Sequence, residues 1–83
     1  LAQNYPNPFN GTTVIEFWLS EEMETELSVF NTAGQEIATP VRGNLQAGSH
    51  RAEIEAAGLA SGMYFYRVSA GGMQAVKKFV VMR

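Results

Sequence analysis

Short segments in which every second residue is apolar run along this chain, and they constrain its fold more than any other feature. Segment 13–19 reads TVIEFWL and segment 63–69 reads MYFYRVS. A period of two, combined with β-branched and aromatic residues, is typical of β-strands with one buried face. We expect the core face to carry Ile15, Phe17, Leu19, Leu27, Val29, Ile37, Ala52, Ile54, Tyr64, Tyr66 and Val68.

Turn-forming residues separate these segments and set the expected strand boundaries. Strands are predicted at 13–19, 25–31, 35–39, 50–56, 63–69 and from 73 or 74 to 82. The first two strands are expected to form an antiparallel hairpin in which Leu19 pairs with Leu27. Pro40 is expected to end the third strand, which leaves 41–49 as a loop tethered by Leu45. Six or seven short strands without a helix predict an all-β fold, a small antiparallel immunoglobulin-like β-sandwich.

The first twelve residues, LAQNYPNPFNGT, have a different character. Two prolines restrict the backbone, and Asn10-Gly11 favours a turn. We expect an extended, non-helical leader that is anchored to the domain by Tyr5 and Phe9. The motif at Pro6–Phe9 is interpreted as a structural latch, and direct contact with a receptor is the alternative.

The length of 83 residues allows one small core and therefore one domain. We expect that domain to span 1–83, with the leader at 1–12 and the β-sandwich at 13–83. The first residue is Leu1 rather than Met. The chain is therefore expected to be a piece excised from a larger protein.

The composition excludes most self-contained chemistry. There is no Cys and no Asp, and His50 is the only histidine. These absences exclude disulfides, cysteine zinc sites, thiol nucleophiles and a Ser-His-Asp triad. We predict no enzyme, no catalytic residue, no metal and no cofactor, and we expect His50 to be a strand-edge side chain. The net charge of −2 also argues against nucleic-acid binding, which usually needs a basic face.

Three features have both a binding interpretation and a structural one. Glu21, Glu22, Glu24 and Glu26 resemble a calcium-binding run, but a solvated loop fits their adjacent spacing better. A helix competes with a strand for the same stretch, 20–30. Trp18 and Phe30 are expected on the face opposite the core, either as an exposed aromatic patch or covered by the leader or by a loop.

The third feature is the basic pair Lys77 and Lys78, which Arg83 follows closely. These residues could dock an acidic partner. Lysines on an edge strand also discourage aggregation between sheets, so both interpretations stay open. Free sheet edges would additionally permit a homodimer.

Five sequence blocks occur in a recognisable order. They are QNYPNPFN-x-TT-x-I-x-F at 3–17, L-x-V-F-N-x-x-G-Q-E-I at 27–37, L-x-A-G-x-H at 45–50, GLASGMYFYRV at 58–68 and KKFVV at 77–81. Together they resemble the type A C-terminal sorting domain of the bacterial type IX secretion system. The resemblance covers essentially the whole chain.

The resemblance implies a non-catalytic targeting module at the end of a secreted cargo protein of Bacteroidetes-type bacteria. Its implied partners are the covalently linked cargo, the outer-membrane translocon and sortase-like components. The implied route passes through the periplasm to the outer-membrane surface or the medium. An accessory immunoglobulin-like or carbohydrate-binding module of an extracellular hydrolase is the alternative function.

Partner recognition is expected to involve the leader motif, the β-prone block and the C-terminal strand, with strand addition at a sheet edge as the mechanism. The candidate residues are Pro6, Asn7, Pro8, Phe9, Gly62, Tyr64, Phe65, Arg67, Lys77, Lys78, Phe79, Val80, Val81 and Arg83.

Overall fold

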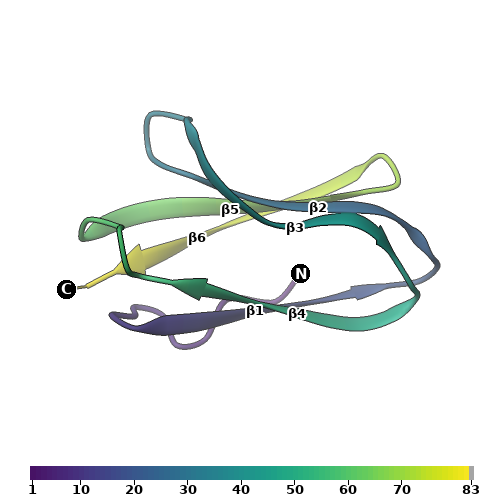
Figure 1. The fold of residues 1–83 in the computed structure, drawn as a ribbon, viewed down its shortest axis with the longest axis horizontal. Helices are drawn as coiled ribbons and strands as arrows, with labels where there is room; N and C mark the ends of the chain where they lie inside the picture. The colour runs from purple at the N-terminus through teal and green to yellow at the C-terminus, as the bar shows by residue number, and fades with distance from the viewer. Residues whose placement is uncertain (83) are drawn as a thin grey trace.

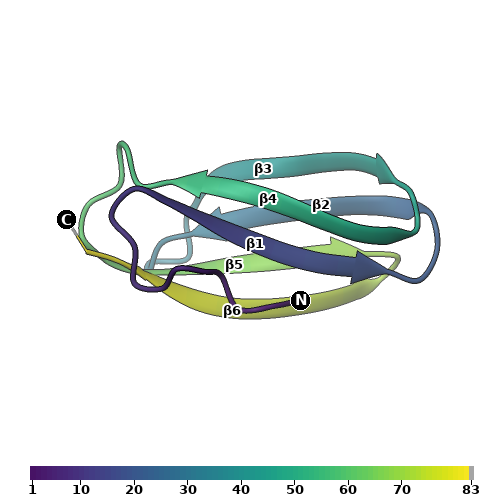
Figure 2. The same cartoon turned by 90° about the horizontal axis from the view of Figure 1, so that it is seen from below.

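The computed structural model describes residues 1–82, which form six antiparallel strands and no helix. The strands are β1 (Thr12–Leu19), β2 (Met23–Phe30), β3 (Glu36–Leu45), β4 (Gly48–Glu55), β5 (Gly62–Ala70) and β6 (Met73–Val81). They pack as two layers (Figures 1 and 2). The structure therefore confirms the small antiparallel β-sandwich and excludes a helix over 20–30.

The two layers are unequal. One sheet has four strands in the order β3-β2-β5-β6, and the other has only β1 and β4. β1 pairs with β4 without interruption, from Thr12 opposite Glu55 to Leu19 opposite Gly48. The predicted hairpin of β1 and β2 is therefore wrong, because the short connection at 20–22 carries the chain from one sheet to the other.

The core follows the alternation of the sequence. All the predicted core residues except Ile37 are buried. Phe79 lies among three other rings, with centroid distances of 5.4 Å to Phe9, 5.5 Å to Tyr64 and 5.8 Å to Tyr66. Because burial of one such aromatic side chain stabilises a fold by about 1.5–3 kcal/mol, this cluster is the centre of the domain.

The third strand differs most from the prediction. β3 continues through Pro40 to Leu45, so residues 41–45 are strand rather than loop. Pro40 is tolerated because β3 is an edge strand, where a missing N–H interrupts no ladder on the outer side. Register shifts against β2 disturb the alternation, and Ile37 is 39% exposed instead of facing the core. Leu45 packs against the core as expected.

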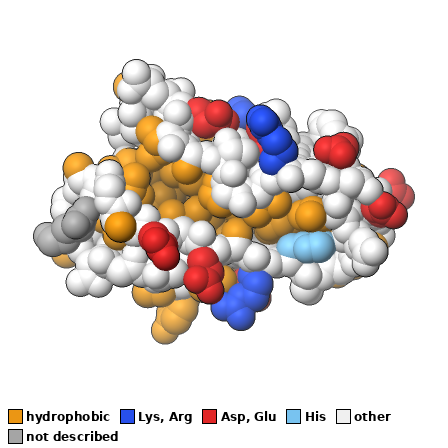
Figure 3. Space-filling model, in the orientation of Figure 1, with side chains coloured by type: hydrophobic (Ala, Val, Ile, Leu, Met, Phe, Trp, Pro, Cys, Tyr) orange, Lys and Arg blue, Asp and Glu red, His pale blue; other side chains and the backbone are white. Residues whose placement is uncertain are grey.

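The side of the sandwich that carries β3 and β4 is open. The inner face of β3 carries Ala38, Val41 and Leu45, which pair with the inward positions of β2 and stay half-buried or exposed. Figure 3 shows apolar side chains along the middle of this side of the molecule, in the hollow between the two sheets. The two-stranded sheet is thus too narrow to cover the four-stranded one.

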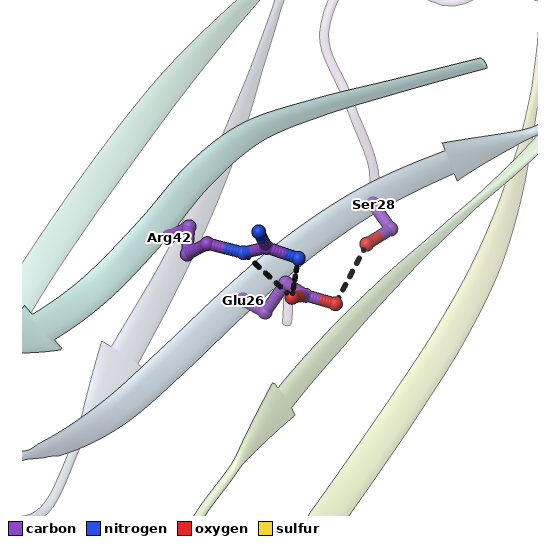
Figure 4. A network of polar contacts seen from close by, with 3 residues as sticks. All are labelled: Glu26, Ser28 and Arg42. Carbon is purple, nitrogen blue, oxygen red and sulfur yellow. Dashed lines mark hydrogen bonds and ion pairs between the residues drawn. The ribbon is translucent and has the colours of Figure 1, made fainter. Parts of the chain in front are cut away.

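One exposed ion pair ties the edge strand β3 to β2 on this open side. Glu26 Oε2 lies 2.9 Å from Arg42 Nη2, and the Ser28 hydroxyl donates to Glu26 Oε1 (Figure 4). The hydrogen bonds from Arg42 and Ser28 hold the pKa of Glu26 below its usual range.

Candidate functional site: the leader and the β5–β6 hairpin

The leader is bound to the core through the hydroxyl of Tyr66. The Asn4 backbone N–H donates to this hydroxyl at 2.9 Å, and the hydroxyl donates to the Ala2 carbonyl at 2.8 Å. Tyr66 comes from the middle of β5 and is fully buried. Its burial raises its pKa above the usual value. The buried hydroxyl is thus satisfied only while the leader is in place.

Asn4, rather than Tyr5, is the polar anchor of the leader. The Asn4 amide donates to Thr13 Oγ1 at 3.0 Å and to the Pro6 carbonyl at 3.2 Å, and both Asn4 and Thr13 are buried. Tyr5 is 81% exposed, so its predicted role as an anchor is wrong. Tyr5 forms an antiparallel bridge with β1, and in extended chain its neighbour Asn4 faces the opposite way, toward the core.

The leader closes the edges of both sheets. Its backbone pairs with β1 through two hydrogen bonds between Tyr5 and Val14, each 2.9 Å long. On β6, Phe9 donates to the Val80 carbonyl at 3.1 Å and accepts from the Met82 N–H at 2.8 Å. Phe9 is itself buried, as predicted. The structure therefore supports the latch interpretation of the motif at Pro6–Phe9.

Two leader side chains complete the cover over β6. Gln3 Nε2 donates to the Lys78 carbonyl at 2.8 Å, and Asn7 Oδ1 accepts from the Val80 N–H at 2.9 Å. The outer edge of the C-terminal strand is therefore already paired between Lys78 and Met82. A partner strand could be added there only if the leader left.

The outer face of the hairpin remains open to a partner. We call the residues Met63, Phe65, Arg67, Val76, Lys78 and Val80 the β5–β6 face. Met63 is 43% exposed and Val76 is 57% exposed, while Phe65 is half-buried. The Arg67 guanidinium lies 4.8 Å from the ring centroid of neighbouring Phe30, and the buried Arg67 Nε has no hydrogen-bond partner within residues 1–82. This face is apolar and cationic at once.

The acidic residues all precede this hairpin in the sequence. All eight glutamates lie at or before Glu55, whereas Arg67, Lys77 and Lys78 follow without any acidic neighbour in sequence. Lys77 lies on the inner side of β6 opposite Tyr66 and is half-buried, whereas Lys78 is exposed opposite Phe65. A charged side chain directed inward protects an edge strand from pairing, so Lys77 fits the protective interpretation and Lys78 the docking one.

The structure divides the predicted recognition residues into buried and exposed groups. The buried ones belong to the core of the folded domain: Phe9, Tyr64, Phe79 and Val81. Those at least partly accessible are Pro6, Asn7, Pro8, Gly62, Phe65, Arg67, Lys77, Lys78 and Val80. Arg83 lies outside the described residues. The contributions of Gln3, Asn4 and Thr13 were missed, because isolated polar residues carry no periodic signal.

Trp18 and Phe30 do not form one aromatic patch. Trp18 is 66% exposed on the outer side of β1, whereas Phe30 lies on the outer side of β2 in the other sheet, beneath Arg67. Trp18 borders an open hollow of about 300 Å³, to which Leu1, Met23 and Met73 also contribute. The hollow is lined mainly by apolar groups.

The described part of the chain contains no cluster of possible metal ligands. No group of three His, Cys, Asp or Glu side chains converges within residues 1–82. Glu24 and Glu26 belong to β2 rather than to a loop. His50 stacks on Phe17 and places Nε2 2.7 Å from the Gln46 carbonyl oxygen. The described residues also include no helix long and apolar enough to cross a membrane.

Comparison with known proteins identifies the family. Residues 3–82 match the family described as the secretion system C-terminal sorting domain. A search of the curated proteins found no match. Domains of this family are in general non-catalytic sorting signals for type IX secretion, which implies export to the cell surface or the extracellular space. The match spans nearly the whole sandwich together with its leader, and the chain belongs to the family of secretion system C-terminal sorting domains.

Proposed function

We propose that residues 1–83 form a single folded sorting domain, excised from a larger secreted protein, that routes its cargo from the periplasm through the type IX outer-membrane translocon. The observation that carries this proposal is the family match, which covers both leader and sandwich. Sortase-like components would act on the cargo after it crosses. The domain contributes a recognised shape and no chemistry of its own.

The translocon is proposed to contact the β5–β6 face rather than the free edge of β6. The leader occupies that edge from Lys78 onward, whereas Val76 and Lys78 are exposed on the face itself. An apolar surface with basic side chains suits a partner whose own surface is apolar with acidic groups at its margin, because complementary charges steer association.

A reporter experiment tests the export route. A reporter carrying a signal peptide is fused to residues 1–83 and expressed in a bacterium with a working type IX system. We expect the reporter in the medium or at the cell surface, and in the periplasm of a translocon-deficient strain. If the reporter stays in the periplasm of the competent strain, the proposed function is wrong.

A matched pair of variants tests the surface. Val76→Asp places an acid on the β5–β6 face and should leave most of the reporter in the periplasm. Ile37→Asp makes the same kind of change at an exposed position of β3, on the opposite edge of the same sheet, and should be exported normally. If both variants are exported equally, and circular dichroism shows that both domains are folded, the translocon does not contact the β5–β6 face.

A further inference from the structure

The four outer edges of the two sheets are protected to different degrees. The leader pairs with β1 and with the C-terminal half of β6. β3 contains Pro40 and an irregular register. β4 has eight regularly paired residues and contains no proline, no lysine and no bulge. β4 carries three exposed charged residues instead: Arg51, Glu53 and Glu55. Charged side chains also protect an edge, so this edge should accept only a strand whose charges complement them.

The free edge of β4 presents a regular row of backbone groups. The Ala56 N–H bonds to the Gly11 carbonyl on the side of β1. Backbone groups alternate sides along a strand, so Ser49, Arg51, Glu53 and Glu55 direct theirs away from β1. No strand within residues 1–82 pairs with this edge. The row is therefore available for an added strand.

The hollow beside β4 contains apolar side chains that are open to view (Figure 3). Figure 2 shows β3 lying beyond the free edge of β4 in the other layer, and β3 leaves Val41 and Leu45 incompletely covered. A strand paired to β4 would lie beneath β3 and cover these side chains. A second copy of the domain paired through β4 would bring its own β3 to the same place, so a single extended segment fits better.

We propose that β4 is a docking edge, separate from the β5–β6 face, which accepts one extended antiparallel strand from another protein. Charge and polarity define the occupant. Opposite Ala52, Ile54 and the inner face of β3 it needs apolar residues. On the outer face it needs an acidic residue opposite Arg51 and basic residues opposite Glu53 and Glu55, because opposite charges across a ladder stabilise the pairing. β4 lies in the other sheet from the β5–β6 hairpin, so the two surfaces share no strand.

The opposite side of the same sandwich shows the same type of interaction. There the leader pairs its backbone with edge strands of both sheets and buries Phe9 between them. The β3–β4 side has the free edges and the uncovered apolar face, and no segment of residues 1–82 fills it.

A designed peptide tests this edge. The probe is Lys-Val-Lys-Val-Glu-Val-Thr, whose residues face Glu55 through Ser49 in order. At a peptide concentration about ten times the Kd, amide exchange at Ser49, Arg51, Glu53 and Glu55 should slow about tenfold. N-methylation of the third and fifth peptide residues, which face β4, should abolish this protection, whereas methylation of the second and fourth should leave it. No protection of β4 at about 5 mM peptide, or protection confined to β3 or β6, overturns the proposal.

Charge variants of the domain make the test specific. Glu53→Lys should weaken the probe about fivefold and should bind better to a peptide whose third residue is Glu, whereas Glu21→Lys in the loop before β2 changes the same charge and should have no effect. If the β4 amides are protected in the absence of peptide and the protection rises with protein concentration, the occupant is a second copy, which also overturns the proposal.

Discussion

The two long sides of this sandwich differ, because one is closed by the leader and the other is left open. On one side the leader, from Ala2 to Phe9, pairs with β1 and β6 and fills the space between the sheets. On the other side β3 and β4 separate, and β3 is paired only with β2, through its backbone ladder and the exposed Glu26–Arg42 ion pair. The contrast teaches that a chain of this size can close one side of its core with its own terminus while the other remains incomplete.

The largest expected loss of stability follows from removing the Phe9 ring, which lies on the leader side. Phe9→Ala should lower the free energy of unfolding by about 3 kcal/mol, because Phe9 is buried against Phe79. Val41→Ala removes a half-buried side chain on the open side and should cost about 1 kcal/mol. Urea unfolding measures both. Equal losses would mean that the open side is as well packed as the closed one.

A smaller loss of stability is expected when the hydrogen bonds between Tyr66 and the leader are removed. Tyr66→Phe leaves the Asn4 N–H and the Ala2 carbonyl without their partner, which should cost about 1–2 kcal/mol. Amide exchange at Asn4 should accelerate while exchange in β2 changes little. Tyr64→Phe is the control, because its hydroxyl bonds to the Ala60 carbonyl and not to the leader. Unchanged exchange at Asn4 would contradict the role of Tyr66 as the anchor.

Alkaline pH should loosen the same contact. Burial raises the pKa of Tyr66 in the folded state, so the unfolded chain ionises first as the pH rises. The stability that Tyr66 contributes is complete below its unfolded pKa of about 10 and is lost as the pH rises further, toward the folded pKa. Thermal unfolding between pH 8 and 11 measures this loss. The Tyr66→Phe variant should show a shallower decline, and an identical slope would rule out Tyr66 as the cause.

The smallest effect concerns the open side. Arg42 and Ser28 lower the pKa of Glu26, so this carboxylate contributes stability above its unfolded pKa and loses it as the pH falls through the lower folded value. Arg42→Gln should move the Glu26 pKa up toward its ordinary value in an NMR titration, with little change in stability because the pair is exposed. A pKa that does not move would show that the ion pair does not form in solution.

Much of the fold was predictable because strand alternation is a local property. Ile15, Phe17 and Leu19 had to share a face in any strand that contains them, and the structure buries all three. The pairing of β1 with β4 was not predictable, because the sequence contains nothing that fixes which strand lies beside which. The predicted end of β3 was wrong for a related reason. Pro40 would end a central strand but is acceptable in an edge strand, and which strand lies at the edge depends on the whole sheet.

The candidate site divides in the same way. Sequence blocks pointed to the leader and to the stretch around Tyr64–Lys78, and residues 3–82 match the family that those blocks indicated. They could not show that Phe79 and Val81 are core while Val76 and Lys78 are exposed, or that the leader covers the edge of β6. Such contacts join residues more than sixty positions apart, as in the bond from Asn4 to Tyr66.

By itself, the sequence determined that this protein is a β-rich domain without Cys or Asp and that all its acidic residues lie at or before Glu55. Only the tertiary structure decided which edges those strands expose. Alternation and charge are carried by neighbouring residues, whereas an edge exists only after every strand has found its partner. The leader pairs with β1 and with the C-terminal half of β6, whereas the outer edge of β4 has no partner strand within residues 1–82.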